Sequence, residues 1–260
     1  MRLRIIRLNT PNKKMINSET KGNQLFSYTY HLSEFISTKI WDTKRYIIPL
    51  QRTCYTIIHK LRSQLDTSSL LLANTNLDGK PHYFDSLYLI LRTCLSDIIC
   101  LYYIIDKEDD NVMLDERITR ILIDHLRYIY PQATDEKKIE IANFHSEWFE
   151  NGKIKSTIKR ISASEMVKEI NNDQYKLQSA RSLEMYHYFS KLEHNGLLSF
   201  PLLHNRYEEI AIENDKERAI DAIIHIMIAI NYTSMLWMDE SDPIFSKLLG
   251  LTEHFMSINN

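Results

Sequence analysis

Apolar side chains recur every three to four residues along most of the chain, which is the spacing of an amphipathic helix. The first such run covers residues 23–40, and the second covers 47–65 with an extension past Ser69. A longer run covers 82–105, after the segment 76–81, which has the residue chemistry of a turn. The first half of the chain is therefore predicted to be helical.

Capping residues set the helix boundaries expected after the acidic run 106–110. Asp115 is a suitable N-cap for a helix that Pro131 would end. The apolar face of that helix is expected to carry Ile118, Ile121, Leu122, His125 and Ile129. A helix over 135–150 follows, and Asn151-Gly152 is predicted to close it.

Four more segments complete the predicted order of helices. Ser162-Ala-Ser-Glu165 fits a capping box that opens a short helix. Asp173 can cap the next helix, which reaches His194. Two further helices are expected over 215–238 and 242–256.

Composition indicates an all-α fold. The chain has 5 glycines and 6 prolines in 260 residues, so it lacks the turn residues that β-rich folds need at each connection. We expect a bundle of about seven or eight helices that forms a single helical domain over 23–258. Residues 1–22 contain six basic side chains, five of them before the single acid Glu19, and are expected to be a poorly ordered basic arm.

Charge and cysteine content bear on the binding partners and the cellular compartment to be expected. With 32 basic and 34 acidic residues, net charge does not indicate a broad nucleic-acid-binding face. The three cysteines show no metal-ligand spacing, which favours a reducing, cytoplasmic compartment. The best membrane candidate is the uncharged stretch 222–238, but it contains His225 and other polar residues, so a buried central helix and no membrane contact are expected.

Common cofactor and metal signatures are missing from the sequence. The five glycines stand alone, so no Gly-rich loop can cradle a nucleotide cofactor. Glu184-Met-Tyr-His187 is a lone Glu-x-x-His pair, whereas a di-iron bundle needs two. Since no paired Cys-x-x-Cys or His-Glu-x-x-His occurs either, we expect neither a cofactor nor a metal.

The predicted helix 82–105 carries a polar stripe with Asp85, Arg92 and Ser96, and Asp97 lies farther round. No acidic residue of this helix stands three or four positions from Arg92. A buried Arg92 would therefore need a partner from another helix. The alternative is an arginine on a solvated edge or in a structural ion pair.

A second polar group lies on the segment 186–196. Leu183, His187, Ser190 and His194 share one side of the predicted helix, with Tyr186 at its border. The helix dipole at the C-terminus favours the protonated form of His194, which could bind phosphate or act as a general acid. The alternative reading is an exposed strip that ends in an ordinary C-cap.

These two segments resemble a group of uncharacterised bacterial helical proteins with an arginine and an acid on a core helix and a Tyr, Ser, His ladder on a later one. The group is discussed beside the HEPN superfamily, all-α domains of toxin–antitoxin, abortive-infection and CRISPR-linked systems, some of which are metal-independent ribonucleases. The resemblance covers 82–196, implies a HEPN-like core, and marks Arg92, Asp97, Tyr186, Ser190 and His194. Ser96 stands where the group usually has a glutamate, which leaves the acidic role to Asp97 or to no residue.

The HEPN nuclease motif, an arginine followed after four to six residues by a histidine, occurs three times. The matches are Arg52 to His59, Arg120 to His125 and Arg181 to His187. Matches at these spacings are expected by chance in a chain of this composition. The best placed is Arg181 to His187, but on a continuous helix these side chains point about 120° apart. They would need a helix break or a second subunit to act on one phosphate.

Asp221 and His225 form a last polar pair, four residues apart in the most apolar segment. A hydrogen-bonded core histidine explains it best. The 15 tyrosines could stack RNA bases, but at helical spacing they more often fill a core.

Two functional hypotheses follow. The first is a non-enzymatic interaction or structural module, in which the residues marked by the resemblance form a buried network that locks two helices and the chain binds a protein partner. The second is a HEPN-like metal-independent ribonuclease or RNA-binding effector of a toxin–antitoxin or phage-defence system, as a homodimer. Its catalytic candidates are Arg181, His187 and His194.

Overall fold

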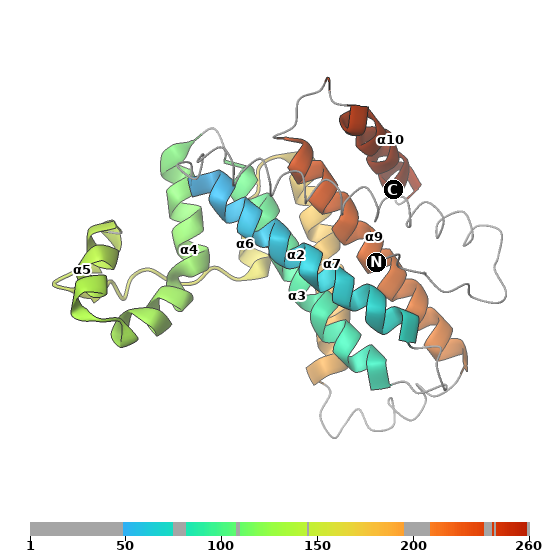
Figure 1. Ribbon diagram of the computed structural model, residues 1–260, viewed down its shortest axis with the longest axis horizontal. Coiled ribbons are helices and arrows are strands. Elements are labelled where there is room, and N and C mark those ends of the chain that lie inside the picture. Colours follow the sequence, from blue (N-terminus) through green and yellow to red (C-terminus); the bar gives the residue numbers. More distant parts are fainter. Residues whose placement is uncertain are drawn as a thin grey trace. The chain divides into compact units, whose positions relative to one another are not determined.

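A computed structural model describes residues 49–74, 82–107, 110–144, 146–194, 209–236, 241 and 243–258. Within these ranges the chain forms eight α-helices, two short 3₁₀ turns and one two-stranded hairpin (Figure 1). The prediction of an all-α, multi-helix fold is thereby confirmed. The predicted basic arm 1–22 and helix 23–40 lie outside the described residues.

The contacts of the chain divide it into two compact units. One consists of 1–98 and 180–260, and the other of 99–179. Two helices, α3 (His82–Ile105) and α7 (Asp173–His194), contribute to both units. The single domain expected over 23–258 stays a prediction.

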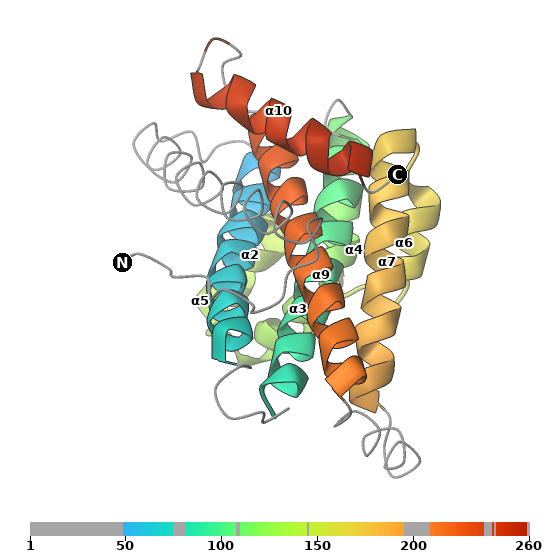
Figure 2. The ribbon, with the colours of Figure 1, turned by 90° about the vertical axis from the view of Figure 1, so that its right-hand side faces the viewer.

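Helix α9 (Glu209–Met235) is the centre of the first unit, where it packs against α2 (Pro49–Asn74) and α10 (Pro243–Ile258). Figure 2 shows α10 lying across the end of α9. Every residue from 222 to 231 is buried, including His225 and Asn231. The prediction of a buried central helix in this segment is confirmed.

Another helix passes a length and composition test for crossing a membrane. It is the segment Ser86–Ile105 of α3, and 61% of that window is buried inside the structure. A core helix of a folded domain passes the same test, because it too is apolar on most of its circumference.

The second unit is built around α4 (Asn111–Ile129), which leads through the 3₁₀ turn Tyr130–Gln132 into α5 (Asp135–Phe144) (Figure 1). The chain then forms a 3₁₀ turn, a hairpin and a short helix: η2 Ser146–Trp148, β1 Phe149–Glu150, β2 Lys153–Ile154 and α6 Ala163–Glu169. A hydrophobic cluster joins these pieces, and its fully buried members are Ile123, Leu126 and Trp148.

The predicted start of α4 is wrong, and its predicted buried face is wrong in part. The N-cap is Asp110, whose carboxylate accepts from the amides of Val112 and Met113, and not Asp115. On the expected apolar face, His125 and Leu122 are exposed. Ile118 is buried as expected, and the other buried residues of the helix are Leu114, Arg117, Thr119, Ile123 and Leu126. The helix turns this way because Arg117 points inward to meet a carboxylate.

The helix predicted over 135–150 is also wrong in its last part. Asn151 and Gly152 have φ of 52° and 70° and form the two-residue turn between β1 and β2. Positive φ at both central residues is what a type I′ hairpin turn requires, and Asn-Gly is its preferred sequence. The same dipeptide also ends helices, so the pairing of Glu150 with Lys153 decides between the two.

Two predicted caps lie close to those observed. Ser162 and Glu165 form the expected capping box at α6. At α7 the cap is Asn172, one residue before the predicted Asp173, because the Asn172 side chain accepts from the amides of Gln174 and Tyr175.

Candidate functional site

Arg92 lies on α3 and is half-buried. Its guanidinium carbon stands 5.7 Å from the ring centroid of Tyr186 on α7. This is within the distance at which a cation is attracted to the face of an aromatic ring. Two of the residues marked by the resemblance are therefore in contact, and the partner of Arg92 comes from another helix.

Asp97 faces a different helix. Its two carboxylate oxygens lie 3.0 Å and 2.7 Å from Nζ of Lys60 on α2. Five residues of helix turn the side chain of Asp97 about 140° away from that of Arg92. Burial raises the pKa of Asp97, and the bond from Lys60 opposes that rise. The structure thus brings Asp97 to Lys60 and not to the Tyr, Ser, His ladder.

The ladder on α7 is only partly assembled. The hydroxyl of Ser190 is buried without a hydrogen-bond partner among the described residues. His187 is exposed, and its ring stands edge-on to Tyr186 at 5.6 Å. His194 is the last residue of α7, and its side chain lies outside the described residues.

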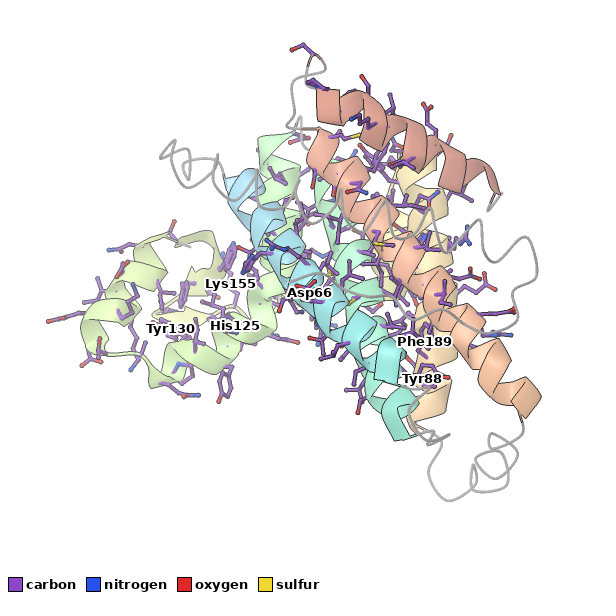
Figure 3. The ribbon with its side chains drawn as sticks, turned by 45° about the vertical axis from the view of Figure 1, so that its right-hand side comes forward. Asp66, Tyr88, His125, Tyr130, Lys155 and Phe189 are labelled. Carbon is purple, nitrogen blue, oxygen red and sulfur yellow. The ribbon has the colours of Figure 1, made fainter. Side chains whose placement is uncertain are left out.

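The core side of α7 holds aromatic rings. Phe189 is buried and stacks on Tyr88 of α3, with ring centroids 5.2 Å apart (Figure 3). These rings pack α7 on α3 one residue before Ser190, which explains why the hydroxyl of Ser190 is enclosed.

Arg181 and His187 do not converge within one chain. Helix α7 is continuous across both residues, so the separation of about 120° remains. Arg181 is half-buried and lies near Asp221 of α9. Partial removal of the Asp221 carboxyl from water raises its pKa although the residue keeps exposed surface, and the charge of Arg181 opposes that rise. His187 faces solvent.

His225 is a hydrogen-bonded core histidine, as predicted. Its Nε2 lies 2.7 Å from Oγ of Ser182 on α7, and both residues are buried. Asp221 is exposed. The sequence does not point to Ser182 as the partner, because the two residues are 43 positions apart and meet only when α7 packs on α9.

The second unit contains an ionic network that sequence reasoning missed. Arg117 of α4 donates to Asp106 Oδ2 at 2.9 Å, to the carbonyl of Glu169 at 2.9 Å and to the carbonyl of Tyr103. The side chains of Arg117 and Asp106 are 3% and 1% exposed. Asp106 also accepts from the backbone amide of Asn172 at 2.7 Å, so it ties the beginning of α7 to the end of α3.

Arg120 extends the network by one turn of α4. Its guanidinium donates to both carboxylate oxygens of Glu169, at 2.7 Å and 2.9 Å. The hydroxyl of Tyr103 donates to Glu169 at 2.8 Å and accepts from Arg120 at 3.0 Å. The bonds from Arg120 hold the pKa of Glu169 below its usual range, while burial raises that of Tyr103. Arg120 is thus committed to Glu169, whereas the His125 of its sequence match is exposed.

A cleft of about 870 Å³ opens beside this network within the second unit. Its wall on α4 belongs to the first three turns of that helix, and the opposite wall is the segment 157–160 after the hairpin. Arg127 fixes this segment to α4 by donating to the carbonyl of Ile158. The lining residues are Val112, Asp115, Glu116, Thr119, Arg120, Trp148, Thr157, Ile158, Lys159, Arg160 and Glu165.

The chemistry of this lining suits binding. None of its residues is a histidine, cysteine or serine. Hydrogen bonds from Ser162 hold the pKa of Glu165 low, so that this carboxyl stays ionised and is a poor general acid. Across the described part of the chain, no three His, Cys, Asp or Glu side chains are grouped to hold a metal ion.

Known proteins offer no parallel: no family model, no curated protein and no solved structure matches this chain. The HEPN resemblance stays a prediction.

Proposed function

We propose that this chain is a non-enzymatic helical module that binds a protein partner in the cleft of the second unit. The observation that carries the proposal is the lining of that cleft, which combines exposed apolar surface and ionised carboxylates with no imidazole or thiol among its residues. A concave site of this volume with a few convergent polar groups is typical of ligand recognition.

The residues first singled out from the sequence support a structural role. Asp97 is held by Lys60, and Arg92 lies over Tyr186. General acid–base catalysis needs proton-transfer groups that reach one substrate atom. In the first unit, Asp97 and Arg92 contact side chains of neighbouring helices and are not arranged around one substrate atom.

The ionic network supports a binding role because it holds one wall of the cleft in place. Arg120 belongs both to the cleft lining and to the bidentate pair with Glu169. A wall that is held by several charge-assisted bonds loses little conformational freedom when a partner binds. The cleft is therefore preorganised on its α4 side.

Site-specific photo-crosslinking in living cells tests the proposal. A photoreactive amino acid at Val112, whose side chain is 78% exposed in the cleft, is expected to attach a protein partner. The matched control is Leu177, which is 55% exposed on α7 outside the cleft and is expected to attach none. Equal labelling at both sites would contradict the proposal.

A second assay addresses catalysis. The purified chain is incubated in chelator with a mixed pool of structured and single-stranded RNA, beside a His187→Ala variant of verified fold. We expect no cleavage by either protein. Cleavage by the unaltered chain that disappears in His187→Ala would replace the present proposal by a metal-independent ribonuclease.

A specific observation favours RNA binding as the second candidate. Tyr186, His187 and Tyr188 follow one another on α7, and an arginine covers each tyrosine ring: Arg92 at 5.7 Å and Arg218 at 4.1 Å. Rings and guanidinium planes are the surfaces on which single-stranded bases stack. A Tyr186→Ala variant would then bind a labelled single-stranded RNA more weakly than the unaltered chain, which gel-shift titration measures.

A further inference from the structure

We propose that the cleft of the second unit recognises a peptide segment that combines basic and aliphatic side chains. This inference rests on the proposed function and names the class of partner for the same site. It follows from three features of the cleft: the balance of its charges, the state of the helix N-terminus beside it, and its apolar surface.

The lining has equal numbers of acidic and basic side chains, but more of its acids than of its bases lack an ion pair among the described residues. Three carboxylates line the cleft, those of Asp115, Glu116 and Glu165, against three cations. Two of the cations are already opposed by carboxylates from outside the lining. Arg120 is held by both oxygens of Glu169, and Arg160 lies 3.4 Å from Asp124, which it shares with Arg127 at 3.6 Å. Glu165 is held by the capping box of α6. Among the described residues Lys159 has no ion pair, and neither have Asp115 and Glu116, so two carboxylates face one cation.

The N-terminus of α4 does not reverse this balance. A helix N-terminus attracts anions through its unbonded amides. Here the carboxylate of Asp110 already accepts from the amides of Val112 and Met113, at 3.1 Å each. An anionic partner would therefore meet an occupied cap and the carboxylates of Asp115 and Glu116, whereas a cationic side chain would meet complementary charge.

Apolar surface lies among these charges. Of the apolar lining residues, Val112 is 78% exposed, Ile158 is half-buried and Trp148 is 6% exposed. Aliphatic side chains that cover Val112 and Ile158 would remove apolar surface from water, which is the main favourable term in association. The volume of about 870 Å³ suits several side chains of a peptide rather than a folded domain.

Charge also selects against other partners. Acidic peptides and nucleic acids would place like charges against Asp115, Glu116 and Glu165, which costs binding free energy. A neutral aliphatic peptide would leave these carboxylates partly desolvated without a counter-charge.

The test is selection of a random dodecapeptide phage library on the full chain, with an Asp115→Lys, Glu116→Lys variant of verified fold as the counter-selection bait. We expect the enriched peptides to be rich in Lys or Arg beside Leu, Ile or Val, and to be lost on the variant. Enrichment of acidic or uncharged peptides, or no enrichment that depends on these two positions, would overturn the inference.

Anisotropy titration of one enriched, fluorescein-labelled peptide then gives affinities for the full chain. Glu116→Gln should weaken binding by up to about tenfold, and the effect should shrink at high salt. Glu136→Gln on α5, outside the cleft, is the matched control and should change nothing.

A variant that gains affinity shows that a change in binding is not caused by misfolding. Lys159→Glu removes the one cation of the lining that has no ion pair among the described residues and should tighten peptide binding by several fold, which a damaged fold cannot do. Unchanged or weaker binding in Lys159→Glu would contradict the charge argument.

The outcomes also separate this inference from the proposed function. Attachment of a partner at Val112 together with acidic enriched peptides would keep the binding module and discard its basic, aliphatic ligand. Failure of both the crosslinking and the peptide selection would discard both.

Discussion

The helical spacing of α4 predicts an apolar side chain at position 117, three residues after Leu114 and four before Ile121, but the residue there is Arg117. The structure buries it with Asp106. The guanidinium also donates to the carbonyls of Tyr103 and Glu169, and Asp106 accepts from the backbone amides of Asn171 and Asn172. A buried ion pair adds little net stability, but removal of one partner leaves the other charge buried alone.

Arg117→Met should therefore destabilise the chain strongly. Asp106 would keep its backbone amide donors but lose its counter-charge, and we expect the free energy of unfolding to fall by about 3 kcal/mol. Urea denaturation followed by circular dichroism measures it. The matched control is Arg160→Met, which breaks an exposed arginine–aspartate pair and should cost less than about 1 kcal/mol. Similar losses in both variants would show that Arg117 and Asp106 do not form a buried pair in solution.

The network also predicts a pH dependence. Hydrogen bonds from Arg120 lower the pKa of Glu169 below its unfolded value of 4.5. A carboxyl with a lowered pKa stabilises the fold above its unfolded pKa, and that contribution is lost as the pH falls through the folded pKa. Glu169→Gln should therefore flatten the fall of Tm below pH 4.5. Scanning calorimetry at several pH values measures this, with Glu136→Gln as control. Parallel curves for Glu169→Gln and the unaltered chain would count against the lowered pKa.

The hairpin shows how an element can depend on one backbone conformation. Gly152 has φ of 70°, a region where a side chain with a Cβ is strained although no atom blocks the space around it. The sequence signal placed the end of a helix at this dipeptide, whereas α5 ends at Phe144 and the dipeptide joins β1 to β2. The dipeptide Asn-Gly is common to helix ends and hairpins, and strand pairing is not visible in a local pattern.

Gly152→Ala should cost about 1 kcal/mol in the free energy of unfolding, because alanine resists positive φ. Gly250→Ala is the matched control in the opposite direction. Gly250 lies in α10 with open space around a new Cβ, so alanine there should stabilise the chain by up to about 1 kcal/mol. Thermal and urea denaturation of both variants give the comparison, and a change of the same sign in both would contradict the hairpin geometry.

The contact between α7 and α9 rests partly on one polar bond, from Ser182 to His225. Ser182→Ala leaves a buried imidazole nitrogen without that partner and should cost about 1–3 kcal/mol in the free energy of unfolding. Ser190→Ala is the matched control. Its hydroxyl is buried without a partner among the described residues, so its loss should cost much less. Urea denaturation measures both, and equal costs would show that the Ser182 bond adds nothing.

At the scale of the whole molecule, the sequence predicted what depends on local patterns. Both ends of α3 and the capping box of α6 are of this kind, because periodicity and caps are properties of adjacent residues. The need of Arg92 for a partner on another helix also followed from spacing on its own helix.

Tertiary pairings could not be predicted in the same way. Asp97 meets Lys60 from 37 positions away, and Arg120 meets Glu169 from 49. No local period relates such residues, because their distance depends on how the helices pack. The boundary between the two units could not be predicted from the sequence for a related reason. It falls inside the continuous helices α3 and α7, where no linker composition marks it.

This arrangement has a consequence for the chain during its synthesis. The first unit is made of 1–98 and 180–260, and the second of the residues between them. A ribosome that adds about 5–20 residues per second releases the whole second unit before it makes α9. The face of α2 that packs on α9 must therefore remain uncovered for several seconds in the nascent chain. The helix that is synthesised early is therefore covered by its packing partner only late, and in that interval its exposed apolar face can bind a chaperone.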